Sequence, residues 1–129
     1  MSWFDGQHNA AFDRACQVGF LMTGDGARPL FRRYEAWCRE RHRPLVWIRT
    51  HGRRADVSLR VDTRGGVLTP ETIEEWTFLL DLMTPHGAVW PTPTGYTVSD
   101  VPLGQSEVIA FRLYEWAAED SPCEAQTIV

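Results

Sequence analysis

The chain contains no lysine, so all thirteen of its basic side chains are arginine. A GC-rich genome, selection against a modifiable residue, and use of the planar guanidinium at anionic surfaces are three explanations that composition does not separate. No apolar run approaches the ~18 residues that a membrane-spanning helix needs. Residues 1–6 also lack the basic start and the apolar stretch of a secretory signal, so we expect a cytoplasmic protein with no membrane partner.

Cysteine is scarce: there are three, Cys16, Cys38 and Cys123, and they form no C-x-x-C pair. An odd number without close spacing argues against structural disulfides and agrees with a reducing compartment. The glycines at 24–26 and 65–66 are not followed by the Lys and Ser or Thr of a phosphate-binding loop. We therefore expect no cofactor, no metal and no catalytic residue that the sequence can identify.

A chain of 129 residues has the size of one domain, and 43% of this one is hydrophobic. Chains of this size bury about two thirds of their unfolded surface around a single core. Fifteen aromatic residues, six of them Trp, indicate a well-packed globular protein and not a disordered one. We predict a single α+β domain over residues 1–118, followed by a mobile acidic tail over residues 119–129.

Two helices are expected first. Residues 4–22 place most of their apolar side chains at helical spacing, and Thr23 with the glycines after it ends the pattern. Residues 28–41 predict a second helix, with Pro29 in its first turn and Pro44 beyond its end. Its apolar stripe comprises Leu30, Phe31, Tyr34, Trp37, Cys38 and Arg41. The short loop between the helices predicts an antiparallel pair.

A β-hairpin should follow, because residues 45–50 and 56–62 alternate apolar and polar side chains on either side of the loop 51–55. Alternation places one set of side chains on the core face, namely Val46, Ile48, Val57, Leu59 and Val61. The opposite face carries Trp47, Arg49, Ser58 and Arg60, and the loop projects Arg53 and Arg54.

The rest of the chain predicts one helix and two strands. Residues 69–83 are a third helix, with Thr69 as N-cap and Pro70 in the first turn. Residues 88–90 and 95–99 resemble strands, but the prolines around them favour edge strands or extended loop. Residues 107–116 suit a buried strand paired with 96–99, although Ser106 would also cap a helix. The expected order is approximately ααββαββ, with two further antiparallel strands after the third helix.

Charge is distributed very unevenly. Residues 28–64 hold eleven of the thirteen Arg against four acids, a formal charge of +7, although the whole chain has a net charge of -4. Residues 65–129 carry ten acids and one Arg. Three interpretations stay open: the Arg pair with acids of the same chain, they bind nucleic acid or another polyanion, or they meet the acidic face of a protein partner. Surface ion pairs contribute only about 0–1 kcal/mol each, so stability alone is a weak reason for this clustering.

The interpretation we favour is a small non-enzymatic binding protein whose Arg-rich face engages nucleic acid or a nucleoprotein. Phosphates would supply the affinity, and Trp47 with His51 would stack on bases. The candidate site comprises Arg32, Arg33, Arg39, Trp47, Arg49, Arg53, Arg54 and Arg60. The alternative is a protein–protein adaptor or inhibitor with opposed basic and acidic faces, which would include a self-associating homo-oligomer. A small enzyme is the third hypothesis.

Two other patterns are weaker indications of a functional site. Cys38 and His42 are spaced i, i+4, which on a helix would suit a metal ligand pair or a thiolate with its imidazole. No second pair with ligand spacing accompanies them, so a packed Cys and a surface His are the simpler interpretation. His86 follows the third predicted helix, where an imidazolium favours the negative end of the helix dipole.

Overall fold

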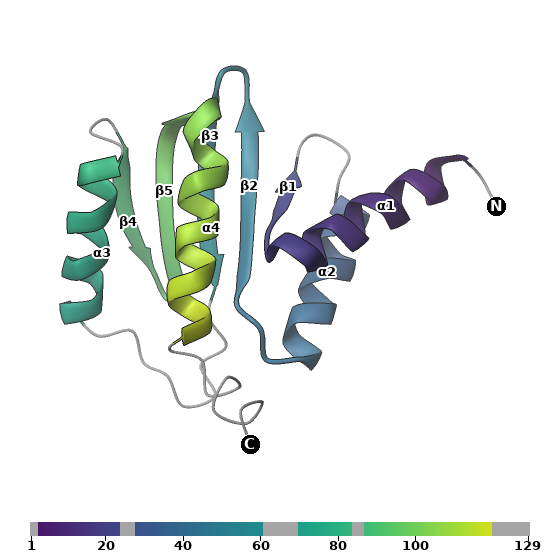
Figure 1. Cartoon of the computed structure of the whole chain (residues 1–129), viewed down its shortest axis with the longest axis horizontal. Coiled ribbons are helices and arrows are strands. Elements are labelled where there is room, and N and C mark those ends of the chain that lie inside the picture. Colours follow the sequence, from purple (N-terminus) through teal and green to yellow (C-terminus); the bar gives the residue numbers. More distant parts are fainter. Residues whose placement is uncertain (1–2, 24–27, 61–69, 84–86, 120–129) are drawn as a thin grey trace.

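The computed structural model describes residues 3–23, 28–60, 70–83 and 87–119. The helices are α1 (Trp3–Val18), α2 (Arg28–Glu40), α3 (Pro70–Met83) and α4 (Leu103–Glu119). The strands are β1 (Leu21–Thr23), β2 (Leu45–His51), β3 (Arg54–Arg60), β4 (Ala88–Thr92) and β5 (Gly95–Pro102), and they form one sheet in the order β1-β2-β3-β5-β4 (Figure 1). Within these ranges, no helix is both long and apolar enough to cross a membrane.

The sheet is mixed because β1 runs parallel to β2, whereas the other neighbouring strands are antiparallel. A parallel pair needs a crossover connection, and α2 supplies it between β1 and β2. The predicted single α+β domain is confirmed, with two N-terminal helices, a hairpin, a third helix and two further antiparallel strands. The boundary of the predicted tail stays a prediction, because residues 120–129 lie outside the described ranges.

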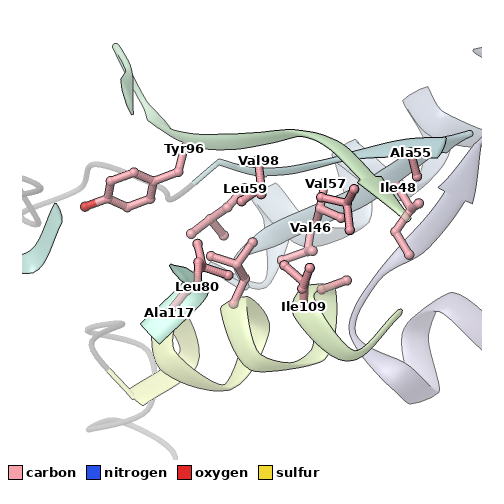
Figure 2. Packing of buried hydrophobic residues seen from close by; sticks show 13 residues of the cluster. Val46, Ile48, Ala55, Val57, Leu59, Leu80, Tyr96, Val98, Ile109 and Ala117 are labelled. Carbon is pink, nitrogen blue, oxygen red and sulfur yellow. The ribbon is translucent and has the colours of Figure 1, made fainter. Parts of the chain in front are cut away.

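The main core lies between the sheet and α4, which crosses one face of the sheet (Figure 1). Figure 2 shows side chains of β2, β3 and β5 meeting those of α4, with Leu80 of α3 beside Ala117. The predicted core residues of the hairpin are buried here: Val46, Ile48, Val57 and Leu59. Val61, the fifth, lies outside the described residues. The alternation of the hairpin is therefore confirmed as far as the structure describes it.

A second core lies on the other side of the sheet, at the β1 edge. Leu21 and Leu45 pack there with the buried stripe of α2, formed by Leu30, Tyr34 and Cys38. Phe12 of α1 closes this cluster through edge contacts with Tyr34 and with Trp37. Of the predicted apolar stripe, α2 buries Leu30, Tyr34 and Cys38 and partly buries Phe31 and Trp37. Arg41, the sixth predicted member, lies beyond the end of the helix and is exposed, so its inclusion was wrong.

The first helix is shorter than predicted. It ends at Val18, and Gly19 follows with a φ of 86°, a left-handed conformation that glycine adopts without strain. A Cβ at Gly19 would also lie 2.7 Å from the Tyr114 ring. Residues 21–23 then form β1, a strand that the sequence did not predict. The two helices contact each other as predicted, but α1 runs across α2, so the predicted antiparallel arrangement is wrong (Figure 1).

The strand predicted over 107–116 is also wrong, because this segment lies inside α4. Its buried positions recur every three or four residues, as on one face of a helix: Ser106, Ile109, Ala110, Leu113 and Ala117. Val108 and Phe111 point outward and stay about half exposed, at 54% and 47%. These two outward apolar residues made the run look like a continuously buried strand. The strand-like segments predicted at 88–90 and 95–99 do form strands, β4 and β5, and β4 takes the place of 107–116 as the partner of β5.

Candidate functional site

The face of the sheet opposite α4 carries the outward side chains of the hairpin. Trp47 and Arg49 of β2 lie on this face together with Ser58 and Arg60 of β3, because the residues that alternate with them fill the α4 core. At the β1 edge α2 covers this face, and Phe31 contacts Trp47 with ring centroids 5.2 Å apart. The helices that contact β5 and β4 are α4 and α3, and both contribute side chains to the core on the opposite face. The outward residues of the hairpin therefore border a part of the sheet that no described helix is seen to cover.

The side of α2 that borders this uncovered sheet is basic. Glu35 forms an ion pair with Arg60 of β3, so the stripe of α2 that contains Glu35 faces the sheet surface. Positions i, i+3 and i+7 of one stripe share a helix face, and Arg32, Glu35 and Arg39 have this spacing. The Arg39 guanidinium lies 3.9 Å from the same carboxylate. Glu35 is thus shared between an Arg of the helix and an Arg of the sheet.

Arg33 lies apart from this group. Its guanidinium lies over the Phe12 ring of α1, 4.2 Å from the ring centroid. Arg41 likewise covers Trp37 at 4.7 Å, and Arg43 donates a hydrogen bond to the Tyr114 hydroxyl on α4. Three Arg of the basic segment therefore engage aromatic side chains elsewhere, and of these three only Arg33 belongs to the site predicted from the sequence.

The tip of the hairpin holds the remaining predicted residues. Strand pairing continues to His51 and Arg54, so the loop is Gly52–Arg53 alone, shorter than predicted. Gly52 has a φ of 64°, as the first central position of a type II′ turn requires. The carbonyl of Arg53 accepts a hydrogen bond from the Leu103 N–H at 3.0 Å, which fixes the tip against the start of α4.

A small polar cluster lies behind this tip. Asp56 accepts a hydrogen bond from the backbone N–H of Asp100 at 3.0 Å, and its carboxylate lies 3.3 Å from the His51 imidazole. Arg54 lies 3.8 Å from the Asp100 carboxylate and also donates to the Asp100 carbonyl. Asp100 has a φ of 58°, a conformation that Asp tolerates better than most residues. The register of β3 and β5 shifts at Asp56, which interrupts the backbone hydrogen bonds between the two strands. At this bulge the Asp56 carboxylate accepts a hydrogen bond from a backbone N–H of β5 in their place.

The predicted Arg residues divide into paired and unpaired groups. Arg39 and Arg60 share Glu35, and Arg54 pairs with Asp100. The second group comprises Arg32, Arg49 and Arg53. None of these three forms an ion pair with a carboxylate of the residues that the structure describes. Both groups lie at exposed or partly exposed positions.

Trp90 was not in the predicted site, yet strand register brings it to the same face. Trp47 pairs with Ser58, Ser58 with Thr97, and Thr97 with Trp90, so one cross-strand row runs through β2, β3, β5 and β4. The hydroxyls of Ser58 and Thr97 are hydrogen-bonded at 3.2 Å, which confirms that the row lies on one face. Trp90 is 57% exposed. Only the pairing of β4 with β5 reveals this neighbour, and local sequence carries no signal for it.

Acidic side chains gather on the helices of the other side. Exposed carboxylates of α3 and α4 are those of Glu74, Glu75, Asp81, Glu107 and Glu115. Glu115 lies 4.0 Å from Arg112 of its own helix. These helices pack on the core face of the sheet, so their exposed carboxylates lie on the other side of the sheet from Arg49 and Arg60.

The Cys38–His42 pair does not form the predicted helical arrangement. The helix ends at Glu40, and His42 has a φ of 54°, so the two side chains do not share a helix face. Cys38 is 2% exposed, and burial raises the pKa of its thiol to about 12, which disfavours the reactive thiolate. No group of His, Cys, Asp and Glu within the described ranges could hold a metal ion. His86 lies outside those ranges.

A groove of about 720 Å³ lies between α1 and α4 beside β1. Its apolar lining includes Phe20, Met22, Val108 and Phe111. Charged side chains of both signs surround these residues, among them Arg14, Glu107 and Arg112. The groove is remote from the uncovered sheet face, because Met22 pairs with Ile48 and therefore lies on the α4 side.

Comparisons with models of protein families, with curated proteins and with solved structures find no match for this chain, so its function must be argued from the geometry of these surfaces.

Proposed function

We propose that the protein is a small binding protein that engages nucleic acid, alone or within a nucleoprotein, through the basic face formed by α2, β2 and β3. The observation that carries this proposal is that Arg32 and Arg49 form no ion pair with a carboxylate of the described residues and border the same sheet face as Arg39 and Arg60, which share Glu35. Arg53, also without an ion pair to a described carboxylate, is exposed at the hairpin tip. Exposed acids of α3 and α4 belong to helices that pack on the opposite, core face of the sheet.

The paired Arg can also serve this function. Arg54 and Arg60 keep 46% and 39% of their side chains exposed, so their ion pairs are surface pairs of about 0–1 kcal/mol. A phosphate oxygen can replace or join such a carboxylate at little cost, because guanidinium offers five N–H donors in a fixed fork. The existing carboxylates orient these side chains before a ligand arrives.

The experiment compares two double substitutions that remove the same charge from opposite sides. Arg49→Ala/Arg53→Ala removes two unpaired cations from the basic face, and Arg14→Ala/Arg112→Ala removes the two Arg that line the α1–α4 groove. Binding of labelled single-stranded and duplex DNA is measured by fluorescence anisotropy over a series of salt concentrations.

Each phosphate that a variant no longer neutralises should reduce the log–log salt slope by about 0.7 on single strands and about 0.9 on duplex DNA. We expect this reduction, with weaker binding at low salt, for Arg49→Ala/Arg53→Ala and not for the control pair. Absence of binding by the wild-type protein at low salt, or an equal reduction of affinity in both variants, would contradict the proposal.

A second candidate function, a protein–protein contact, is supported by exposed apolar side chains on α3. Phe78 and Leu82 are 65% and 68% exposed one helical turn apart, and Leu79 beside them is 39% exposed. Their helix contacts β4, whose outer edge pairs with no described strand. Self-association through this edge predicts a mass that rises with concentration. A constant monomer mass from micromolar to millimolar protein, measured by sedimentation, would rule it out.

A further inference from the structure

We infer that the uncovered face of β3, β5 and β4 is a stacking platform for the bases of a single-stranded nucleic acid, with Trp90 as its main stacking residue. This inference rests on the proposed function and specifies its ligand class. It depends on the side chains that the sheet places between and around the two tryptophans of the cross-strand row.

The platform has short side chains in its middle and an aromatic side chain at each end. Ser58 and Thr97 occupy the two central positions of the row, and their hydrogen bond holds both short side chains close to the sheet. Neighbouring strands lie about 4.8 Å apart, so the backbones at Trp47 and Trp90 are separated by about 14 Å. This length admits a few bases, whose stacking step is about 3.4 Å in a helical strand.

The two ends present different stacking surfaces. At the β4 end, the Trp90 ring is 57% exposed on a strand that no described helix covers from this side. At the β2 end, Trp47 is half-buried against Phe31, and the Arg60 guanidinium lies 5.7 Å from its ring centroid. Both indole rings and guanidinium planes stack on bases. Arg60, oriented by Glu35, therefore offers a second stacking plane at the inner end of the row.

Apart from Arg60, the cations lie along the borders of this platform. Arg32 and Arg39 follow the α2 border, while Arg49 and Arg53 lie toward the hairpin tip. A single strand can place its phosphates against these Arg and turn its bases toward the hydroxyl row. In a duplex, the base faces are already stacked on one another, so Trp90 would have no partner. The arrangement of phosphate and base contacts thus selects single strands.

The test separates base stacking from phosphate binding. The variants are Trp90→Ala, its conservative counterpart Trp90→Phe, and Phe111→Ala, which removes a comparably exposed aromatic ring from α4 on the opposite side. The probes are a labelled oligothymidylate of about a dozen nucleotides and a duplex of equal length, a range that suits the site sizes of small single-strand binders. Circular dichroism and sedimentation report the fold and the mass of each variant.

We expect the wild-type protein to bind the single strand more tightly than the duplex, and its Trp fluorescence to fall on binding. Trp90→Ala should weaken single-strand binding by about 5- to 150-fold, the loss expected for one base–aromatic stack. Trp90→Phe should retain most of the affinity, and Phe111→Ala should match the wild type. Binding of the duplex should be the same in all variants.

Several results would overturn the inference. If salt-dependent binding persists but the duplex is preferred, or if Trp90→Ala behaves like Phe111→Ala, the platform is wrong while the proposed function stands. If Trp90→Ala changes the mass of the protein and not its single-strand affinity, Trp90 is a contact between copies. If the wild-type protein binds neither probe at low salt, the inference and the proposed function fail together.

Discussion

Gly95 is the position where the smallest substitution should cause the largest loss of stability. It begins β5 and pairs with Arg60 of β3. A Cβ built there would lie 1.8 Å from the carbonyl oxygen of Leu59 and 2.8 Å from its carbonyl carbon. These atoms belong to the backbone of the neighbouring strand, so no side-chain rotation can relieve the overlap. Gly95→Ala therefore requires β3 and β5 to separate at one end of their ladder.

Separation would disturb Leu59 and Tyr96, which are both buried in the α4 core. Overpacking of a core costs about 1–3 kcal/mol where side chains can adjust, and here the backbone must move, so we expect a loss of at least about 3 kcal/mol. Gly104→Ala is the matched control, because its Cβ position in the first turn of α4 has open space within 4 Å among the described residues. Alanine is favoured over glycine in helices by up to about 1 kcal/mol, so this variant should be equally or more stable.

Urea denaturation followed by Trp fluorescence and circular dichroism measures both free energies of unfolding. Both variants add one methyl group, so the effect on the unfolded chain is similar in the two. A difference between their free energies of unfolding therefore reports the space around each Cβ in the folded protein. Gly95→Ala with the stability of wild type would refute the close approach of β5 to β3, and with it the register that aligns Trp47, Ser58, Thr97 and Trp90.

Two further predictions concern buried ionisable side chains. The Tyr96 hydroxyl is buried with no hydrogen-bond partner among the described residues, and burial raises the pKa of Tyr96 to about 12. In the unfolded chain the Tyr pKa is about 10. The folded state therefore binds the phenol proton more tightly, and this contribution to the free energy of unfolding is complete below pH 10 and is lost as the pH rises toward 12. Removing the unsatisfied hydroxyl by Tyr96→Phe should therefore raise the free energy of unfolding by about 1 kcal/mol at neutral pH, and the variant should unfold less readily in alkali. Urea titrations at neutral and alkaline pH measure both effects, and a lower free energy of unfolding at neutral pH would contradict the prediction. In a Cys123→Ser background, Cys38 should react with a thiol reagent far more slowly than the partly exposed Cys16, because Cys38 is buried and its thiol pKa is raised to about 12. Equal reaction rates in variants that keep only one of these two cysteines would contradict the burial of Cys38.

Local periodicity was sufficient for α2 and for the β2–β3 hairpin. In both, the positions that face one core are consistently apolar, so a single register satisfies the pattern. The buried stripe of α2 and the buried alternation of the hairpin follow from Tyr34, Cys38, Val46 and Ile48 being where the period requires apolar residues. The assignment of Trp47, Arg49 and Arg60 to one face came from the same alternation.

Tertiary contacts decided the segments where the sequence prediction was wrong. Three residues are too few to show a strand period, so β1 depends on its pairing with β2 and on Gly19, which ends α1 beside the Tyr114 ring. In α4, apolar residues occupy outward positions as well as inward ones, which hides the helical period. Trp90 joins the candidate site only through the ladder of β5, a relation between distant segments that no local pattern contains.

The connection between β1 and β2 explains how a continuous basic segment comes to lie mostly on one side. A crossover helix must cover one face of the sheet, and α2 covers the face that carries the outward residues of β2 and β3. The basic residues of a helix and of a hairpin, which follow one another in the chain, therefore meet across Glu35 instead of lying on opposite sides. The later connection from β5 into α4 takes Glu107 and Glu115 to the other face. Which face each connection crosses thus decides which charged side chains meet, and β5 and β4 stay beside the Arg of the hairpin without a covering helix of their own because α2 packs on β1 and β2 at the other end of the sheet.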